Sequence, residues 1–324
     1  MTNSQALYEL SPNFKLASEA NDVGMGGLRS FDGRAFPLQS VKVRCQIAGP
    51  CARTVIEQHF ANPYNEVLDA TWIFPLPSDG ALIALEFLAG DVRVIGECQK
   101  REEALAHFEQ ARADGKRTAL LETEQKGVHT LSIAGLPPKS DVIVQLTIVE
   151  LLPIVDARFR WQFPTTIAPR YTPGNEVAHT GFGRSPDTDL VPNASRLTPP
   201  IRLAGGTTLD LEVEIAGSLS SLESSVHAVK LYLDSGSVRI APSASATLNR
   251  DFILEFSVAD TTAPVTRAFT DGTYTALIIE PPTTINVRAF PRDAVFVVDI
   301  SGSMDGSKLT AAKAALTGAL HGLN

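Results

Sequence analysis

The sequence predicts a mainly β fold: a β-sandwich-like first domain with one covering helix, a second β-rich block, and the opening strand–turn–helix of an α/β domain. Three observations predict it. Apolar and polar residues alternate in many short segments, which is the pattern of strands with one buried face. A single amphipathic segment interrupts the first half. Near the end, a continuous apolar run is followed by a polar turn and a helical pattern.

The strand pattern is clearest in four runs, which are Val41–Ile47, Val142–Ile148, Leu209–Ile215 and Phe252–Val258. In each run every second residue is apolar and the residues between are mostly polar. Proline and glycine separate the runs, as in Leu136–Pro138, and mark turns. We therefore expect antiparallel strands packed face to face in a sandwich.

One helix is expected over Glu102–Ala113. Leu105, Phe108 and Ala111 form an apolar stripe at helical spacing, and the acidic residues of the first turn suit the positive end of the helix dipole. Gly115 then ends the helix. We expect this helix to cover one face of a sheet.

The composition changes between residues 173 and 200, where proline, serine, threonine and asparagine dominate and periodicity is weak. Such stretches are typical of loops and linkers. The expected domains are residues 1–172 as the first β domain, 173–200 as a linker, 201–290 as a second β-rich domain, and 291–324 as the start of an α/β domain.

The last segment has the order of a doubly wound fold. Ala294–Val298 is continuously apolar, as in a central strand covered on both faces. Asp299–Gly306 is a polar turn, and Lys308–Leu323 has an amphipathic helical pattern. A domain of this kind needs on the order of 100 residues, so we expect residues 291–324 to be a truncated N-terminal piece of one.

The polar turn is the one place in the sequence that indicates chemistry. Asp299, Ser301 and Ser303 put one carboxylate and two hydroxyls at alternate positions just after the expected strand. Mg²⁺ prefers oxygen ligands and keeps several waters, and open α/β sheets bind ligands beyond the carboxyl ends of their strands. With one carboxylate the ion keeps positive charge and an open position, which an acidic group of a protein partner would fill.

The turn has three other interpretations. The nucleophile elbow of α/β-hydrolases needs glycine two residues on either side of the serine, and Ser301 has Asp299 and Ser303 there instead. An aspartyl-phosphate phosphatase or ATPase would use Asp299 as its nucleophile, but the lysine of the Asp-Lys-Thr-Gly-Thr motif is absent. The third is that Asp299 and Ser301 simply cap the following helix.

Charge and composition argue against other classes. The formal net charge of −8 and the absence of a lysine or arginine cluster argue against binding to nucleic acid or anionic lipid. No apolar run reaches the ~18 residues of a transmembrane helix, and the N-terminus has no secretory signal. The three cysteines, Cys45, Cys51 and Cys98, are too few for a disulfide framework. We therefore expect reduced thiols and a cytoplasmic location.

The turn resembles a known motif. Asp299-Ile300-Ser301-Gly302-Ser303-Met304, followed by Gly306 and Lys308, is similar to the metal-ion-dependent adhesion motif (MIDAS) that opens von Willebrand factor type A domains. The resemblance implies that Asp299, Ser301 and Ser303 hold Mg²⁺ directly or through water, together with a threonine and a second aspartate from later loops. The sequence stops at Asn324 before such loops, so we expect weak metal binding by this chain alone.

The upstream sequence resembles the vault/inter-α-trypsin (VIT) domain, which precedes a type A domain in inter-α-trypsin inhibitor heavy chains. The motifs that carry this resemblance are Phe74–Pro77, Ala104 with Ala111–Gly115, Ala119–Glu122 and Pro169–Gly174, and Asn249–Phe252 and Pro291–Asp293 resemble the joining segment. The resemblance implies a non-enzymatic protein-interaction or adhesion-type protein, with a secreted or surface-associated location as the alternative. A metal-independent structural assembly module stays open as the second function. The sequence predicts neither the ligand nor the oligomeric state.

Overall fold

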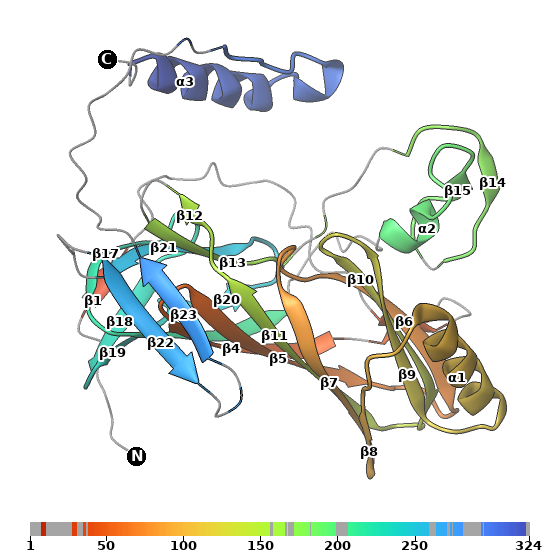
Figure 1. The fold of residues 1–324 in the computed structure, drawn as a ribbon. Helices are drawn as coiled ribbons and strands as arrows, with labels where there is room; N and C mark the ends of the chain where they lie inside the picture. Colours follow the sequence, from red (N-terminus) through yellow and green to blue (C-terminus); the bar gives the residue numbers. More distant parts are fainter. Residues whose placement is uncertain are drawn as a thin grey trace. The chain divides into compact units, whose positions relative to one another are not determined.

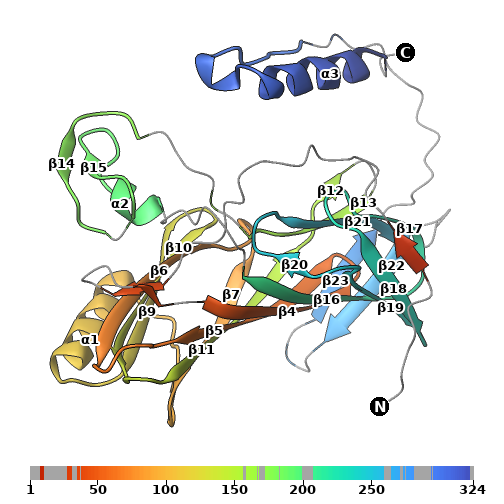
Figure 2. The same cartoon turned by 180° about the vertical axis from the view of Figure 1, so that it is seen from behind.

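The computed structural model describes residues 8–10, 28–30, 35–36, 38–155, 158–165, 167, 172–181, 183–198, 207–258, 264–270, 273, 275–280, 293 and 295–321. The chain divides into two compact units, Met1–Thr261 and Thr262–Asn324, and each is described by itself. Figures 1 and 2 show the ribbon from opposite sides. Several predicted motif residues, among them 169–171, 291–292, 294 and 322–323, lie outside the described residues.

The largest sheet of the first unit has ten strands, in the order β1-β18-β19-β16-β4-β5-β11-β7-β8, with β20 paired to β16. Their bounds are β1 Tyr8–Leu10, β4 Leu38–Ala48, β5 Cys51–Ala61, β7 Ala81–Ala89, β8 Val92–Ile95, β11 Asp141–Leu151, β16 Thr208–Ala216, β18 Val229–Asp234, β19 Ser237–Pro242 and β20 Ala246–Thr247. Neighbouring strands are antiparallel except for β16 and β4, which run parallel.

The described residues of the first unit also form two smaller sheets and a hairpin. The five-stranded sheet has the order β3-β2-β6-β10-β9, the four-stranded sheet has the order β12-β13-β21-β17, and β14 pairs with β15. The bounds are β2 Leu28–Ser30, β3 Ala35–Phe36, β6 Leu68–Pro75, β9 Thr118–Gln125, β10 Val128–Leu136, β12 Ile154–Val155, β13 Arg158–Phe163, β14 Glu176–Ala178, β15 Asp187–Thr188, β17 Leu219–Glu223 and β21 Phe252–Val258. The two helices are α1 Arg101–Ala113 and α2 Ala194–Leu197.

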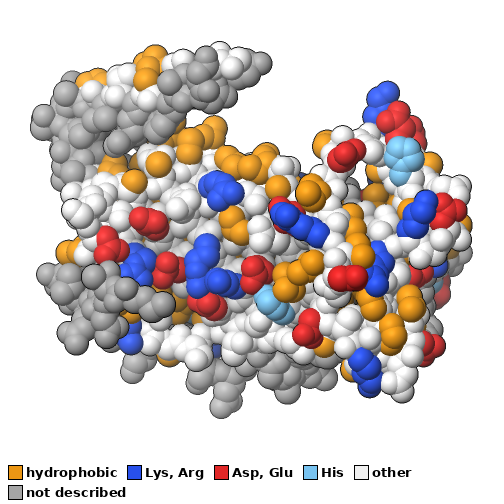
Figure 3. All heavy atoms as spheres, turned by 90° about the horizontal axis from the view of Figure 1, so that it is seen from below, with side chains coloured by type: hydrophobic (Ala, Val, Ile, Leu, Met, Phe, Trp, Pro, Cys, Tyr) orange, Lys and Arg blue, Asp and Glu red, His pale blue; other side chains and the backbone are white. Residues whose placement is uncertain are grey.

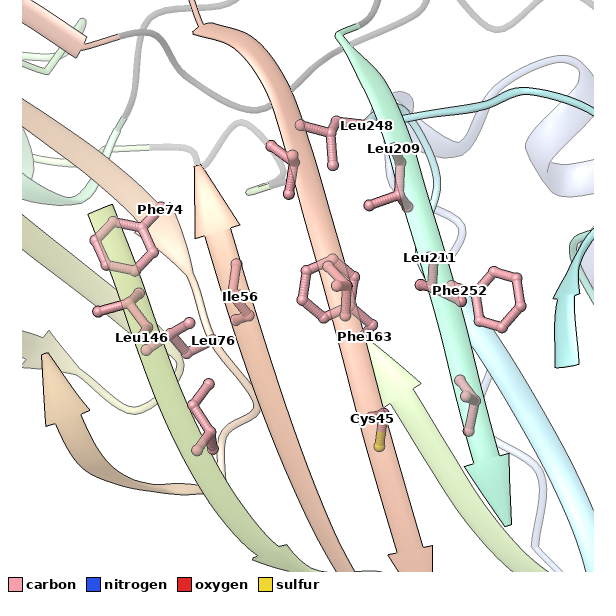
Figure 4. Close-up of a cluster of buried hydrophobic side chains, with 14 of the residues drawn as sticks. Cys45, Ile56, Phe74, Leu76, Leu146, Phe163, Leu209, Leu211, Leu248 and Phe252 are labelled. Carbon is pink, nitrogen blue, oxygen red and sulfur yellow. The ribbon is translucent and has the colours of Figure 1, made fainter. Parts of the chain in front are cut away.

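One hydrophobic core joins the three larger sheets, because the alternate apolar residues of their strands point to the same interior. It contains Val43 and Leu146 of the ten-stranded sheet, Trp72 of the five-stranded sheet, and Trp161 and Phe252 of the four-stranded sheet. Figure 4 shows part of this cluster, where side chains of the long strands meet Phe74, Phe163 and Phe252. The mainly β fold and the alternating strand pattern predicted from the sequence are confirmed.

The covering helix is also confirmed. Helix α1 packs against β9 (Figure 1), with Phe108 as its buried residue in contact with Leu120 and Ala134. Gly115 ends the helix with a φ of +69°, a left-handed conformation that favours glycine. Arg112 fixes the last turn by an ion pair with Asp69, at 2.7 Å between Nε and Oδ2.

Residues 173–200 were expected to separate two β domains, but strands from before and after them pair within the same sheets. Strand β16 lies beside β4 in parallel, with Thr208 opposite Ser40 and Ile215 opposite Ile47, and β21 pairs with β13. The buried face of β16 reaches the same core as β4, so strands from both sides of residues 173–200 share one interior. Periodicity finds strands, but pairing over such a long sequence separation is set by tertiary contacts.

The described part of residues 173–200, the range expected to be a linker, holds a hydrogen-bonded unit. The carboxylate of Asp187 accepts four hydrogen bonds: Ser195 donates from its backbone N–H and Oγ at 2.8 and 2.7 Å, and Thr180 donates likewise at 2.8 and 2.7 Å. Burial raises the pKa of Asp187, but these hydrogen bonds outweigh it and lower the pKa to about 2. Arg196 ties the unit to β9 through Glu122 and Glu124, at 2.6 and 2.7 Å.

The second unit contains a β-hairpin, a short 3-10 helix and a longer helix. The hairpin is formed by β22 Val265–Thr270 and β23 Thr275–Glu280, the 3-10 helix is Gly302–Met304, and α3 is Ser307–His321. Helix α3 confirms the helix predicted at the end of the chain. No helix within the described part of the chain is long and apolar enough to cross a membrane.

The prediction of a central strand over Ala294–Val298 is wrong for residues 295–298, the part of that range that the structure describes. Residues 295–298 have no strand conformation, and Val295 and Val297 are 87% and 92% exposed. A central strand needs partners for its backbone groups and cover for both faces, and no described strand pairs with this segment.

Candidate functional site

The residues predicted to bind metal lie in the loop that leads into α3. Asp299 and Ser301 are both exposed, and the Asp299 Oδ1 accepts a hydrogen bond from the Ser301 backbone N–H at 2.8 Å. Hydrogen bonds from the Ser301 backbone and side chain lower the pKa of Asp299. The carboxylate is therefore ionised at neutral pH and is held over the turn.

The rest of the loop is fixed by its own backbone. Met304 donates its N–H to the Ser301 carbonyl at 2.8 Å, which closes the 3-10 turn. The second carboxylate of the loop, Asp305, accepts from the Gly306 N–H at 2.9 Å, and Gly306 has a φ of +79°, which favours glycine. The loop thus has a defined shape before any ligand is considered.

The structure brings together two of the three predicted ligands. Asp299 and Ser301 are in contact, and Ser303 lies in the 3-10 turn two residues further on, although its side chain lies outside what is described. Among the described residues, this loop included, no group of three or more histidine, cysteine, aspartate or glutamate residues is placed to hold a metal ion. One carboxylate with neighbouring hydroxyls is a sparse, hard oxygen donor set, which fits Mg²⁺ better than a softer metal.

A second unusual group, Glu150, was missed by the sequence analysis. It continues the inward series Val142, Val144, Leu146 and Ile148 of β11, so the strand periodicity itself puts a carboxylate on the core side. Glu150 is only 9% exposed, and burial raises its pKa to about 7, an effect that the nearby Trp161 indole opposes and Asp79 reinforces. The sequence feature that predicts it is a charged residue at a core-facing position of an alternating strand.

Comparison with known families identifies the domain that the ten-stranded and five-stranded sheets share. Residues 38–148 match the family model of the vault protein inter-alpha-trypsin domain, VIT. The match runs from the first residue of β4 almost to the end of β11 and includes α1. The chain therefore carries a VIT domain, as the sequence resemblance indicates.

Several curated proteins are similar to this chain. Human protein mono-ADP-ribosyltransferase PARP4 is 27% identical over 173 residues, which are 50% of this chain and 10% of that protein. Mouse von Willebrand factor A domain-containing protein 5A is 27% identical over 157 residues, or 48% of this chain and 20% of that protein. Bovine inter-alpha-trypsin inhibitor heavy chain H3 is 24% identical over 307 residues, or 90% of this chain and 31% of that protein.

The chain thus spans between 10% and 31% of the length of these three relatives. Among solved structures, an M1 zinc metallopeptidase from Deinococcus radiodurans aligns with 79% of this chain and 48% of its own, at 8% identity and a TM-score of 0.34. That similarity is too weak to support an argument about fold or function.

Proposed function

We propose that this chain is part of a non-enzymatic protein-interaction or adhesion-type protein, which binds a protein ligand through Mg²⁺ at Asp299, Ser301 and Ser303. The observation that carries the proposal is the exposed Asp299 carboxylate, fixed by the Ser301 N–H at 2.8 Å at the start of α3. The VIT domain upstream supports it, as do relatives whose names include a von Willebrand factor A domain or an inter-alpha-trypsin inhibitor heavy chain.

The chemistry of the loop suits this role. An ionised Asp299 neutralises one of the two charges of Mg²⁺, and serine hydroxyls add neutral oxygens. The ion would keep a net positive charge at an exposed loop, where an aspartate or glutamate of a partner can reach it. A single carboxylate also makes a weak site.

Two other functions make different predictions. A metal-independent assembly module would bind its partners equally well with or without EDTA, and Asp299→Ala would change nothing. An aspartyl-phosphate enzyme would acquire acid-stable, hydroxylamine-labile phosphate on Asp299. The similarity to a mono-ADP-ribosyltransferase covers 10% of that protein and gives no support to transferase chemistry here. The cytoplasmic location stays a prediction.

Titration with Mn²⁺, followed by its electron paramagnetic resonance signal, tests the proposal. Three proteins are compared, which are the unmodified chain, Asp299→Ala, and Asp305→Asn as a matched control from the same loop. Weak one-site binding is expected for the chain and for Asp305→Asn, and none for Asp299→Ala. Equal Mn²⁺ affinity in all three proteins would show that the ion binds elsewhere.

A further inference from the structure

Residues 150–155, which we call the connecting segment, carry the chain from the ten-stranded sheet to the four-stranded sheet. They comprise the end of β11, two further residues and β12 (Figure 1). Leu151 and Ile154 are 69% and 60% exposed, whereas Glu150 and Leu152, which face the core, are 9% and 5% exposed. Since little apolar surface holds this segment, it should open locally at a lower free energy than the central strands.

Two backbone hydrogen bonds depend on the position of the connecting segment. The Leu152 N–H donates to the Pro50 carbonyl at 2.7 Å, and the Arg160 N–H donates to the Pro153 carbonyl at 3.0 Å. The first bond ties the segment to the turn between β4 and β5, and the second ties it to β13. Both amides are protected only while the segment is closed, so their hydrogen exchange measures its opening.

Glu150 is the one charged residue of the connecting segment, and it faces the core. The Trp161 indole N–H interacts with its carboxyl group and lowers the pKa, but the Oε1 atom of Glu150 is buried without a hydrogen-bond partner among the described residues. The neighbouring basic residue, Arg160, pairs instead with Glu255 at 3.1 Å. A buried carboxyl group with one incomplete partner and no cation is stable in this position only while it is protonated.

Water can hydrate an ionised Glu150 fully only if the connecting segment moves. A cavity of about 250 Å³ lies beside the segment, and Leu151, Pro153 and Gln162 are among the residues that line it. A water molecule takes up about 30 Å³ in the liquid, so the cavity has room for several. The Oε1 atom is shielded from this space in the closed arrangement. A displacement of the segment would therefore bring the carboxylate into contact with water.

We propose that Glu150 makes the connecting segment a pH-sensitive switch, which is closed on Trp161 when the carboxyl group is protonated and opens locally when it is ionised. The proton acts as a ligand of the closed arrangement, because only the neutral carboxyl group is buried there at low cost. Opening breaks the contact between β11 and β13, so pH changes how firmly the ten-stranded and four-stranded sheets are joined at this end. The switch needs no metal and is independent of the Asp299 loop.

The pH range of the switch follows from the closed and open arrangements. Burial raises the pKa of Glu150 to about 7 in the closed arrangement, and a hydrated carboxyl group in the open one has the ordinary value of 4.5. Between these values the closed segment holds a proton that the open segment has lost, so the open fraction increases with pH. The ratio of open to closed segments should increase about 40-fold from pH 5 to pH 7, and by about twofold at most above pH 7.

The other titratable groups that face Glu150 keep their charge between pH 5 and pH 8. Asp79, on the turn between β6 and β7, has a lowered pKa because Lys126 donates a hydrogen bond to it. Arg160 on β13 stays protonated, and burial raises the pKa of the Cys45 thiol on β4 to about 12. A change in the connecting segment over this range is therefore due to Glu150.

Amide hydrogen exchange of the full chain, measured by nuclear magnetic resonance between pH 5 and pH 8, tests the switch. Protection factors, which correct for the intrinsic pH dependence of exchange, should fall about 40-fold from pH 5 to pH 7 at Leu152 and Arg160 and level off above pH 7. Both amides should be less protected than those of β4 and β5. Low concentrations of urea should not change their exchange, because local opening exposes little surface.

Glu150→Gln, which keeps the shape of the side chain and cannot ionise, should give the same protection factors at Leu152 and Arg160 at pH 5 and pH 7. Glu97→Gln, at an exposed position, is the matched control and should keep the fall of the unmodified chain. The proposal is overturned if the two amides are equally protected at pH 5 and pH 7 in the unmodified chain, or if Glu150→Gln keeps the fall. It is also overturned if both amides exchange with the same protection factors and urea dependence as β4 and β5, because ionised Glu150 would then loosen the whole fold.

Discussion

Glu150→Gln should stabilise the fold at alkaline pH and have little effect in acid. The pKa of Glu150 rises from 4.5, its ordinary value, to about 7 in the folded chain. Between these values the unfolded chain has lost the proton and the folded chain still holds it, so stability falls as pH rises through this range. Above pH 7 Glu150 is ionised in both the folded and the unfolded chain, and the free-energy cost of its buried charge no longer changes with pH.

The magnitude follows from the two pKa values. Each pH unit between them is worth about 1.4 kcal/mol, so the ionised Glu150 costs the folded chain at most about 3 kcal/mol. Glutamine has nearly the same shape and no charge, so the variant avoids this cost. At pH 8.5 the variant should be more stable by about 2–3 kcal/mol, and at pH 5, where Glu150 is protonated, the difference should be below about 1 kcal/mol.

Urea unfolding followed by tryptophan fluorescence measures this difference, since Trp72 and Trp161 are both fully buried. Glu97→Gln, at an exposed position, controls for a general effect of removing one negative charge. It should leave the midpoints of urea unfolding at pH 5 and pH 8.5 unchanged. The reasoning is refuted if Glu150→Gln changes the free energy of unfolding by the same amount at pH 5 and pH 8.5. It is also refuted if the variant is less stable than the unmodified chain at the higher pH.

Two further predictions concern residues 172–198. Asp187→Ala removes four hydrogen bonds and should raise amide hydrogen exchange throughout this segment. In the unmodified chain, the stabilisation by Asp187 is present above its ordinary pKa of 3.8 and is lost as pH falls through about 2. Arg196→Ala leaves Glu122 and Glu124, whose side chains are 9% and 3% exposed, without that partner and should cost about 3 kcal/mol in urea unfolding. Arg101→Ala, at a 61% exposed side chain, should cost less than about 1 kcal/mol.

The sequence predicts the local elements well, because their patterns are local. The alternation in β4, β11, β16 and β21 follows from one buried face, and the stripe and glycine stop of α1 follow from helical spacing. The placement of β16 beside β4 could not be predicted, because strand pairing depends on contacts between residues more than 150 positions apart.

The candidate sites show the same limit. The spacing of Asp299 and Ser301 is visible in the sequence, and in the structure the Asp299 carboxylate accepts the Ser301 backbone N–H; metal binding by these residues stays a prediction. The apolar run before them was predicted as a buried strand from composition alone, but a strand also needs neighbours, and its described residues have none. The alternation of β11 predicts that Glu150 faces the core. Its burial depends on β13 and on the β6–β7 turn, which the local pattern does not contain.

The claim that Asp299 and Ser301 form the core of a cation site is tested most directly by nuclear magnetic resonance with substoichiometric Mn²⁺. The paramagnetic ion broadens signals within a short distance, so the amides of residues 299–304 should disappear first, and excess Mg²⁺ should restore them. Uniform broadening, or selective broadening at other acidic residues while residues 299–304 stay sharp, would contradict the account.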